Sequence, residues 1–257
     1  NPNLQNIPIR TPRGQQVRKA FIARNPDYVL LSADYSQIEL AVFAHLSGDE
    51  NMQRAFIEGT DIHKASAALL FGVPPESVTP DMRRTAKTIN FGVIYGMSAF
   101  RLANALGISR TDAAQFIKNY FKTYSAIKIF MEETVRTAEE RGYVETLFGR
   151  RRAIMNINSR NKVEKAAAER VAVNTPVQGS AADIVKKAML SVDDALKAQG
   201  LNARLLLQVH DELILEAPER EVEQVKALVK EAMESVVTLT VPLRVSIESG
   251  DCWGSFH

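Results

Sequence analysis

Two short apolar runs near the C-terminal end of the chain are separated by only three polar residues. The runs cover residues 205–209 and 213–215, and the residues between them are His210, Asp211 and Glu212. This spacing predicts a tight antiparallel hairpin. Such turns usually carry Gly, Asn or Pro, which supply the backbone angles of a tight reversal, and this tip has none of them. A solvated polar turn and a metal site are both compatible with two acids at such a tip.

A second acid at a strand end favours the metal site. Residues 28–33 form an apolar run that ends at Asp34, and residues 37–46 have helical spacing. This pattern predicts a strand, an acid at its exit and then a helix. Carboxylates held at strand ends suit Mg²⁺, which prefers oxygen ligands and can bridge to substrate phosphates. Asp34 and Asp211 are therefore the candidate metal ligands.

The segment from Pro80 to Gly96 is predicted to form a helix with Thr79 as its N-cap. Four of its residues recur every four positions and lie on one slowly winding stripe. The stripe consists of Arg83, Lys87, Phe91 and Tyr95. Cations in the first turns oppose the helix dipole, which favours an anionic partner such as a polyphosphate. A surface helix with solvated cations and core aromatic residues is the alternative.

Composition limits the class of protein more than it defines the function. The chain has 257 residues, of which 46% are hydrophobic and 24% charged, and its net charge is only +2. One cysteine, Cys252, excludes an intramolecular disulfide framework. No apolar run reaches the roughly 18–20 residues of a membrane span. We expect a cytoplasmic protein, because a single cysteine fits a reducing compartment, and a fragment of a longer chain, because there is no initiator Met.

The order of the remaining patterns predicts an α+β core with a helical insertion. Residues 61–138 are helical in spacing, with breaks at residues 72–75, 79–80 and 107. A basic hairpin is expected over residues 143–154. Helices are expected over residues 162–199, kinked or divided at Pro176 and Gly179, and over residues 219–236, followed by a strand over residues 241–247.

Five stretches carry a further signal because of their content and order. They are LQNIP at residues 4–8, DYSQIEL at 34–40, RRTAKTINFGVIYG at 83–96, PVQGSAAD at 176–183 and QVHDE at 208–212. The second, third and fifth closely resemble the three polymerase motifs of family A DNA polymerases, the bacterial DNA polymerase I group. The resemblance extends over essentially the whole chain.

The resemblance implies the fold and its division. It implies an α+β right-hand polymerase architecture, with an antiparallel palm sheet, a largely helical fingers insertion and no thumb in this chain. The palm would comprise residues 1–41 and 161–257, and the fingers residues 42–160. The thumb and any exonuclease domain would lie in an N-terminal remainder of the same polymerase, which is an expected partner.

The resemblance also implies roles for individual residues. The catalytic set is Asp34, Asp211, Glu212 and Lys87, with a lesser role for Glu212 than for Asp211. The metal set is Asp34, Asp211 and the backbone carbonyl of Tyr35. The nucleotide-binding set is Gln37, Glu39, His63, Arg83, Lys87, Phe91 and Tyr95, in which Glu39 and Tyr95 would exclude a ribose 2′-hydroxyl. The DNA-binding set is Arg10, Arg170, Asn174, Gln178 and His210.

These roles predict template-directed addition of dNTPs to a primer 3′-hydroxyl with two Mg²⁺ ions as cofactors, in DNA replication or repair. Primer-template DNA and dNTP are the expected partners, and no membrane is expected. A two-metal nuclease and a non-catalytic DNA-binding fragment that needs the thumb are the alternatives. Ala41 and Phe43 depart from the family pattern, which usually has an arginine and a smaller aliphatic residue at these positions.

Overall fold

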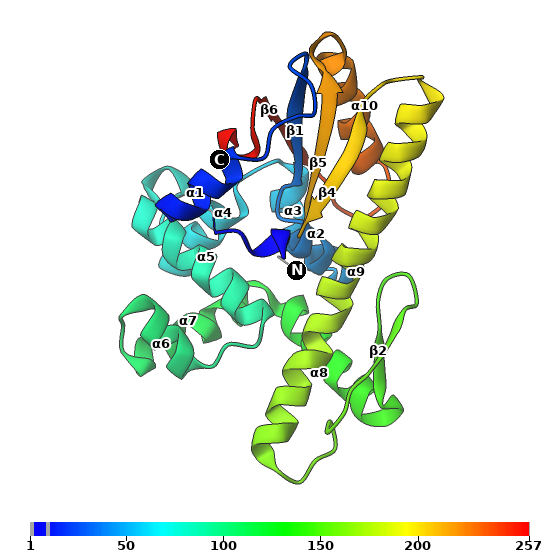
Figure 1. The fold of residues 1–257 in the computed structure, drawn as a ribbon. Helices are drawn as coiled ribbons and strands as arrows, with labels where there is room; N and C mark the ends of the chain where they lie inside the picture. Colours follow the sequence, from blue (N-terminus) through cyan, green and yellow to red (C-terminus); the bar gives the residue numbers. More distant parts are fainter. Residues whose placement is uncertain (1–2, 9–10, 257) are drawn as a thin grey trace. The chain divides into compact units, whose positions relative to one another are not determined.

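The computed structural model describes residues 3–8 and 11–256, and Figure 1 shows its helices and strands. These elements fall into two compact units. The first unit comprises Asn1–Ile38 and Ala181–His257, and the second comprises Glu39–Ser180. A four-stranded antiparallel sheet lies in the first unit, and the second is largely helical. The predicted α+β class is therefore confirmed. The units change near residues 38 and 180, whereas the boundaries predicted for palm and fingers, at 41 and 160, stay a prediction.

The sheet of the first unit has the strand order β4-β5-β1-β6. Its strands are β1 (Tyr28–Tyr35), β4 (Arg204–Val209), β5 (Glu212–Pro218) and β6 (Val245–Gly250). In the register of β1 with β5, Asp34 lies opposite Glu212, and Ser32 lies opposite Ile214. Side chains alternate between the two faces of a strand, so Ser32, Asp34 and Glu212 lie on the same face.

The opposite face of the sheet packs on α10 (Val222–Glu234). Val225, Val229 and Met233 are buried along one side of this helix. The Tyr35 hydroxyl donates to the backbone carbonyl of Met233 at 2.7 Å, and burial raises the pKa of that hydroxyl. Tyr35 therefore stays protonated near neutral pH and fastens the end of β1 to the helix.

The face of the sheet that carries Ser32 and Glu212 is apolar toward its other end, where the C-terminal segment packs on it. Trp253 in η4 (Trp253–Ser255) is 1% exposed and packs edge-on against Phe21, with ring centroids 5.4 Å apart. The guanidinium of Arg18, in α1 (Pro12–Lys19), lies 4.2 Å from the centre of the Trp253 ring. Trp253 belongs to the same buried apolar cluster as Leu30 and Ile214 of the sheet.

Side-chain caps begin most helices of the second unit. Its helices are α3 (Glu50–Ile57), α4 (Ile62–Phe71), α5 (Pro80–Ile94), α6 (Ala99–Leu106), α7 (Arg110–Thr123) and α8 (Ser125–Arg141), with most of α2 (Ile38–Ser47) and half of α9 (Lys162–Ala198). Thr79 accepts a hydrogen bond from the backbone of Met82, which confirms the predicted cap. Gly72 and Gly107 end α4 and α6 in the left-handed conformation. Among the described residues, no helix is long and apolar enough to cross a membrane.

The basic hairpin is present and braces α9. Its strands are β2 (Tyr143–Glu145) and β3 (Arg151–Ala153). The Leu147 N–H donates to Ser180 Oγ at 2.7 Å, and Arg150 donates to the carbonyl of Gly179 at 3.1 Å. Pro176 removes one helical hydrogen bond, yet α9 is a single helix. The helix is therefore not divided at Pro176 or Gly179, and the predicted kink stays a prediction. The contacts from the hairpin support the helix where the proline removes a hydrogen bond.

The last strand begins later than the apolar alternation predicts. β6 starts at Val245, which pairs with Tyr35 at the end of β1. Val241 and Leu243 are buried but belong to no strand. Pro242 between them lacks the N–H that a ladder needs, and β1 has ended by this point. The predicted start at residue 241 was therefore wrong.

Replacing Ser180 by Ala tests the brace on α9. Ser180 is fully buried, and its removal leaves the Leu147 N–H without its acceptor. The free energy of unfolding, measured by denaturant titration, should fall by about 1–3 kcal/mol. The exposed Ser77→Ala should change it by less than about 0.5 kcal/mol. Equal stability of the two variants would contradict the brace.

Candidate active site

The tip of the β4–β5 hairpin consists of His210 and Asp211. Glu212 already belongs to β5, so the prediction of a three-residue tip was wrong by one residue. His210 has a φ of 56°, in the left-handed region that a two-residue hairpin turn requires. A residue other than glycine in this region costs of the order of 1–3 kcal/mol. The turn keeps this strained geometry at the point where it presents Asp211.

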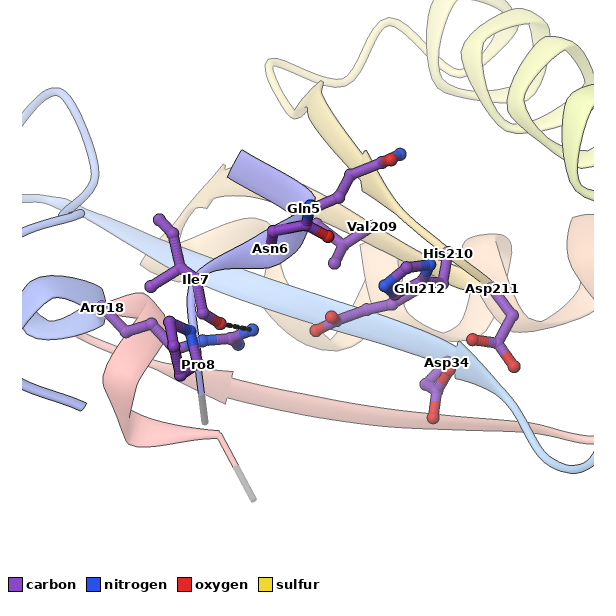
Figure 2. Close-up of a pocket in the computed structure, with 10 residues that line it drawn as sticks. All are labelled: Gln5, Asn6, Ile7, Pro8, Arg18, Asp34, Val209, His210, Asp211 and Glu212. Carbon is purple, nitrogen blue, oxygen red and sulfur yellow. Dashed lines mark hydrogen bonds between the residues drawn. The ribbon is translucent and has the colours of Figure 1, made fainter. Parts of the chain in front are cut away.

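Strand pairing brings Asp34 and Asp211 together. The N–H of Tyr35, the residue after Asp34, donates to the backbone carbonyl of Asp211 at 3.3 Å. Both aspartates line one cavity of about 620 Å³. Figure 2 shows the two carboxylates at this end of the sheet. The two acids that the sequence places at separate strand ends therefore face one cavity.

The charge on Asp211 is only partly compensated by its surroundings. Burial raises the pKa of its carboxyl, and its own backbone N–H and His210 oppose this shift without cancelling it. A divalent cation would favour the ionised form. Among the described residues, no group of three or more His, Cys, Asp or Glu could hold a metal ion. Asp34 and Asp211 are two carboxylates on one cavity, and carboxylate oxygens are ligands that hard divalent cations accept.

Glu212 belongs to a different polar network. Figure 2 shows its side chain running along the sheet, away from Asp211 and toward Arg18. Glu212 is 7% exposed, and its carboxylate accepts a hydrogen bond from Ser32 Oγ at 2.5 Å. Arg18 is itself buried and donates to the backbone carbonyl of Ile7 at 3.2 Å. This arrangement suits a supporting role for Glu212 beneath the aspartates.

The other predicted residues of the first unit differ in what they offer to a ligand. The side chain of Tyr35 is committed to Met233, so only its backbone is left for the predicted metal contact. Gln37 is partly exposed and has a left-handed φ of 60°. His210 is exposed at the hairpin tip. Arg10 lies outside the described residues.

The stripe on α5 lies in the second unit and has the predicted polarity. Arg83 and Lys87 are exposed, and Phe91 and Tyr95 are partly buried. The rings of Phe91 and Tyr95 are stacked, with centroids 6.3 Å apart and an angle of 16°. The Tyr95 hydroxyl donates a hydrogen bond to the Glu39 carboxylate. The structure therefore joins the two residues that the resemblance pairs, and it presents two cations beside two stacked rings.

Asp61 and His63 lie next to the N-terminal half of this stripe and make defined polar contacts. Arg83 Nε donates to Asp61 Oδ2 at 2.5 Å. His63 is 2% exposed, and its Nδ1 lies 3.0 Å from Asn90 Nδ2. Burial lowers the pKa of His63 to about 4, with Lys87 and Arg83 acting in the same direction and Asp61 opposing them. His63 is therefore neutral at physiological pH.

Three predicted DNA-binding residues share one face of α9. Arg170, Asn174 and Gln178 recur every four residues. Gln178 is exposed, and Asn174 Oδ1 is buried without a partner among the described residues. A Cβ atom at Gly96 would lie 2.9 Å from Arg170 Cγ. Glycine at position 96 therefore permits the close approach of Arg170.

Comparison with protein families assigns the chain. The model of DNA polymerase family A matches residues 1–255. The chain belongs to DNA polymerase family A. This confirms the resemblance that the polymerase motifs indicated, and it covers both compact units.

Named relatives agree with this membership. The chain is 54% identical over 253 residues to the thermostable DNA polymerase I of Thermus thermophilus, covering 98% of this chain and 30% of that protein. It is 52% identical over 252 residues to DNA polymerase I of Bacillus caldotenax, covering 98% and 29%. The chain therefore spans about 30% of the length of these relatives.

A solved structure gives the same result for the fold. It is described as the POL domain of Pol1 from M. smegmatis in complex with DNA primer-template and dNTP. The TM-score is 0.94 at 45% sequence identity, over 99% of this chain and 45% of that one. The predicted polymerase fold is confirmed.

Sequence reasoning missed the partners that hold the predicted residues in place. Ser32 interrupts an apolar strand, and this polar position was a usable signal for the bond to Glu212. Asp61 precedes a helical pattern, as an N-cap does, but nothing local indicates its bond to Arg83. Asn90 and Arg18 are buried polar residues, and the contacts of Asn90 with His63 and of Arg18 with Trp253 join segments that are separate in sequence.

Protonation of His63 should destabilise the fold in acid. Above the ordinary pKa of 6.5, the imidazole is neutral in both the folded and unfolded states. Between pH 6.5 and about pH 4, only the unfolded state takes up the proton, so the free energy of unfolding decreases as the pH is lowered. The full loss is about 3 kcal/mol.

Denaturant titrations across this window, with the wild type and His63→Gln, should show that the variant lacks this part of the pH dependence. NMR titration of the folded chain gives the ring pKa directly. A His63 ring that titrates near its ordinary value would contradict the buried, neutral assignment.

Proposed function

We propose that this chain carries the nucleotidyl-transfer site of a template-directed DNA polymerase. In this reaction the primer 3′-hydroxyl attacks the α-phosphate of a dNTP, and pyrophosphate leaves. The observation that carries the proposal is the pair of carboxylates, Asp34 and Asp211, at adjacent strand ends in one cavity. Membership of DNA polymerase family A supports the choice of reaction.

Asp34, Asp211 and the backbone carbonyl of Tyr35 would hold the metal ions. Two bound Mg²⁺ ions supply Lewis-acid stabilisation of phosphate charge and activation of the attacking hydroxyl. The burial of the Asp211 carboxylate, which its surroundings compensate only in part, supports this assignment, because a cation there would restore the balance of charge. Glu212 would have a supporting role next to the metal site, where it accepts the hydrogen bond from Ser32 and interacts with the charge of Arg18.

The residues of the second unit would bind the incoming nucleotide. Arg83 and Lys87 carry exposed charges suited to a triphosphate. Phe91 offers a ring to the sugar and base, and Glu39 with Tyr95 forms a hydrogen-bonded pair that would block a ribose 2′-hydroxyl. His63, and Gln37 of the first unit, complete the proposed nucleotide set.

Primer-template DNA is the proposed macromolecular partner. The solved structure with a TM-score of 0.94 is described as holding DNA primer-template and dNTP, which supports the same ligands here. The DNA contacts proposed for this chain are Arg10, Arg170, Asn174, Gln178 and His210. The exposed position of Gln178 and His210 agrees with this role.

The two rival functions make different demands on the chain. A two-metal nuclease would use the aspartates but has no use for exposed cations and stacked rings on α5. A non-catalytic DNA-binding fragment would need neither the aspartate pair nor the stripe on α5. The hydrogen-bonded Glu39–Tyr95 pair and the family membership favour the polymerase.

Loss of either aspartate should abolish DNA synthesis. Asp34→Ala and Asp211→Ala should each reduce primer extension about a thousand-fold or more, because each removes a ligand of the ions that stabilise the transition state. Glu223→Gln, at an exposed carboxylate on α10, is the matched control and should extend primers normally. Near-normal extension by Asp211→Ala would overturn the assignment.

The Glu39–Tyr95 pair should control sugar selection. Glu39→Ala should lower the preference for dNTP over rNTP about 10-fold or more, because removing the side chain opens space for a 2′-hydroxyl. Tyr95→Phe, which loses the hydrogen bond but keeps the ring, should act in the same direction with a smaller effect. The measurement is the ratio of kcat/KM for matched dNTP and rNTP. An unchanged ratio in Glu39→Ala would refute the gate.

A further inference from the structure

Two adjacent arginines on α5 have different surroundings. Arg84 pairs with Asp81 of its own helix, and both side chains are at least 78% exposed. Arg83 instead binds Asp61, which precedes α4, and the side chains are 45% and 34% exposed. The Arg84 pair is an ordinary surface ion pair of small energetic value. The Arg83 pair instead connects α5 to the start of α4, so it fixes the position of the Arg83 side chain relative to a second helix.

Asp61 is itself held by the backbone. Its Oδ1 accepts hydrogen bonds from the N–H groups of His63 at 2.9 Å and Lys64 at 3.2 Å, which makes it the N-cap of α4. Its Oδ2 accepts the bond from Arg83 Nε. The carboxylate is therefore oriented by the helix start and presents one defined acceptor to Arg83.

This bond uses only one of the five N–H donors of the guanidinium. The planar group is rigid, so fixing Nε also fixes the direction of Nη1 and Nη2. These two nitrogens form the fork that binds oxyanions through two parallel hydrogen bonds. A long arginine side chain loses rotamer freedom when it binds a ligand, and prior fixation lowers that cost.

We infer that Asp61 is a positioning residue that holds Arg83 ready for the triphosphate of the incoming nucleotide. This inference rests on the proposed triphosphate role of Arg83. Asp61 does not touch the nucleotide in this account, and it acts through the arginine alone.

The protonation state of Asp61 agrees with such a role. Burial alone would raise the pKa of its carboxyl, but the hydrogen bond from Arg83 and that from the Lys64 N–H outweigh burial, and the pKa is lowered. Asp61 therefore stays ionised throughout the neutral range. His63, the next residue but one, is neutral and does not compete for the carboxylate.

When Asp61 is replaced, the loss of its charge and the loss of its support for Arg83 should change the affinity for triphosphate in opposite directions. Loss of a negative charge beside a triphosphate site should strengthen triphosphate binding through Coulomb attraction. Loss of the support for Arg83 should weaken it. The inference predicts that weakening dominates, so the direction of the change is itself diagnostic.

The test uses Asp61→Ser, because serine retains the N-cap function but is too short to hold Arg83. Equilibrium dialysis of the chain with Mg²⁺ and a dNTP gives the dissociation constant. Asp61→Ser should raise it about 3- to 10-fold, the scale of immobilising one long side chain. It should leave binding of the corresponding deoxynucleoside, which has no phosphate, unchanged. Asp81→Ser is the matched control at Arg84 and should bind the dNTP as the wild type does.

A double-mutant cycle with Arg83→Ala makes the test specific. Arg83→Ala should raise the dissociation constant, and Asp61→Ser should then add nothing further. An unchanged or lower dissociation constant in Asp61→Ser, with Arg83→Ala still impaired, overturns the inference alone. An equal effect of Asp61→Ser with and without Arg83 also overturns it. Normal dNTP binding by Arg83→Ala would instead overturn the proposed role of Arg83, and the inference with it.

Discussion

The antiparallel pairing of β1 with β5 is the interaction on which the candidate site depends. Leu31 lies opposite Leu215 and Ala33 opposite Leu213, and all four are buried on the face that packs on α10. A slip of one residue would expose these side chains and turn Asp34 toward the helix. The apolar face therefore fixes the register, and the register places Asp34 beside the hairpin tip. Hydrophobic burial on one face of the sheet positions the charges on the other.

In the second unit, α5 likewise has one side that packs in the core and one side that carries the candidate ligand-binding groups. The buried side of α5 includes Ala86, Ile89 and Val93, and this packing holds the helix in place. Its other side carries exposed cations and half-buried rings. Polar contacts then orient individual groups, as Asp61 does for Arg83 and Asn90 does for the buried His63 ring. Ligand-binding groups are thus held by neighbours that need not touch the ligand themselves.

Local patterns were sufficient to predict much of the fold. The α5 helix and its cap, the basic hairpin and the acid-tipped hairpin depend on periodicity and turn residues within a few positions. The errors arose where distant segments decide the outcome. Val245 begins β6 because Tyr35 is its partner, and Pro176 stays within a helix that the hairpin supports. Candidate site residues were indicated by the motifs, but their supporting contacts join residues far apart in the sequence.

The central claim is that Asp34 and Asp211 share divalent cations, and anomalous diffraction from crystals of the chain soaked with Mn²⁺ and a dNTP tests it most directly. Mn²⁺ shares the oxygen preference of Mg²⁺ and gives a locatable signal. We expect an anomalous peak within coordination distance of both carboxylates, and no such peak in Asp211→Asn. Mn²⁺ bound only elsewhere in the chain, or a peak at this position that persists in Asp211→Asn, would contradict the shared metal site.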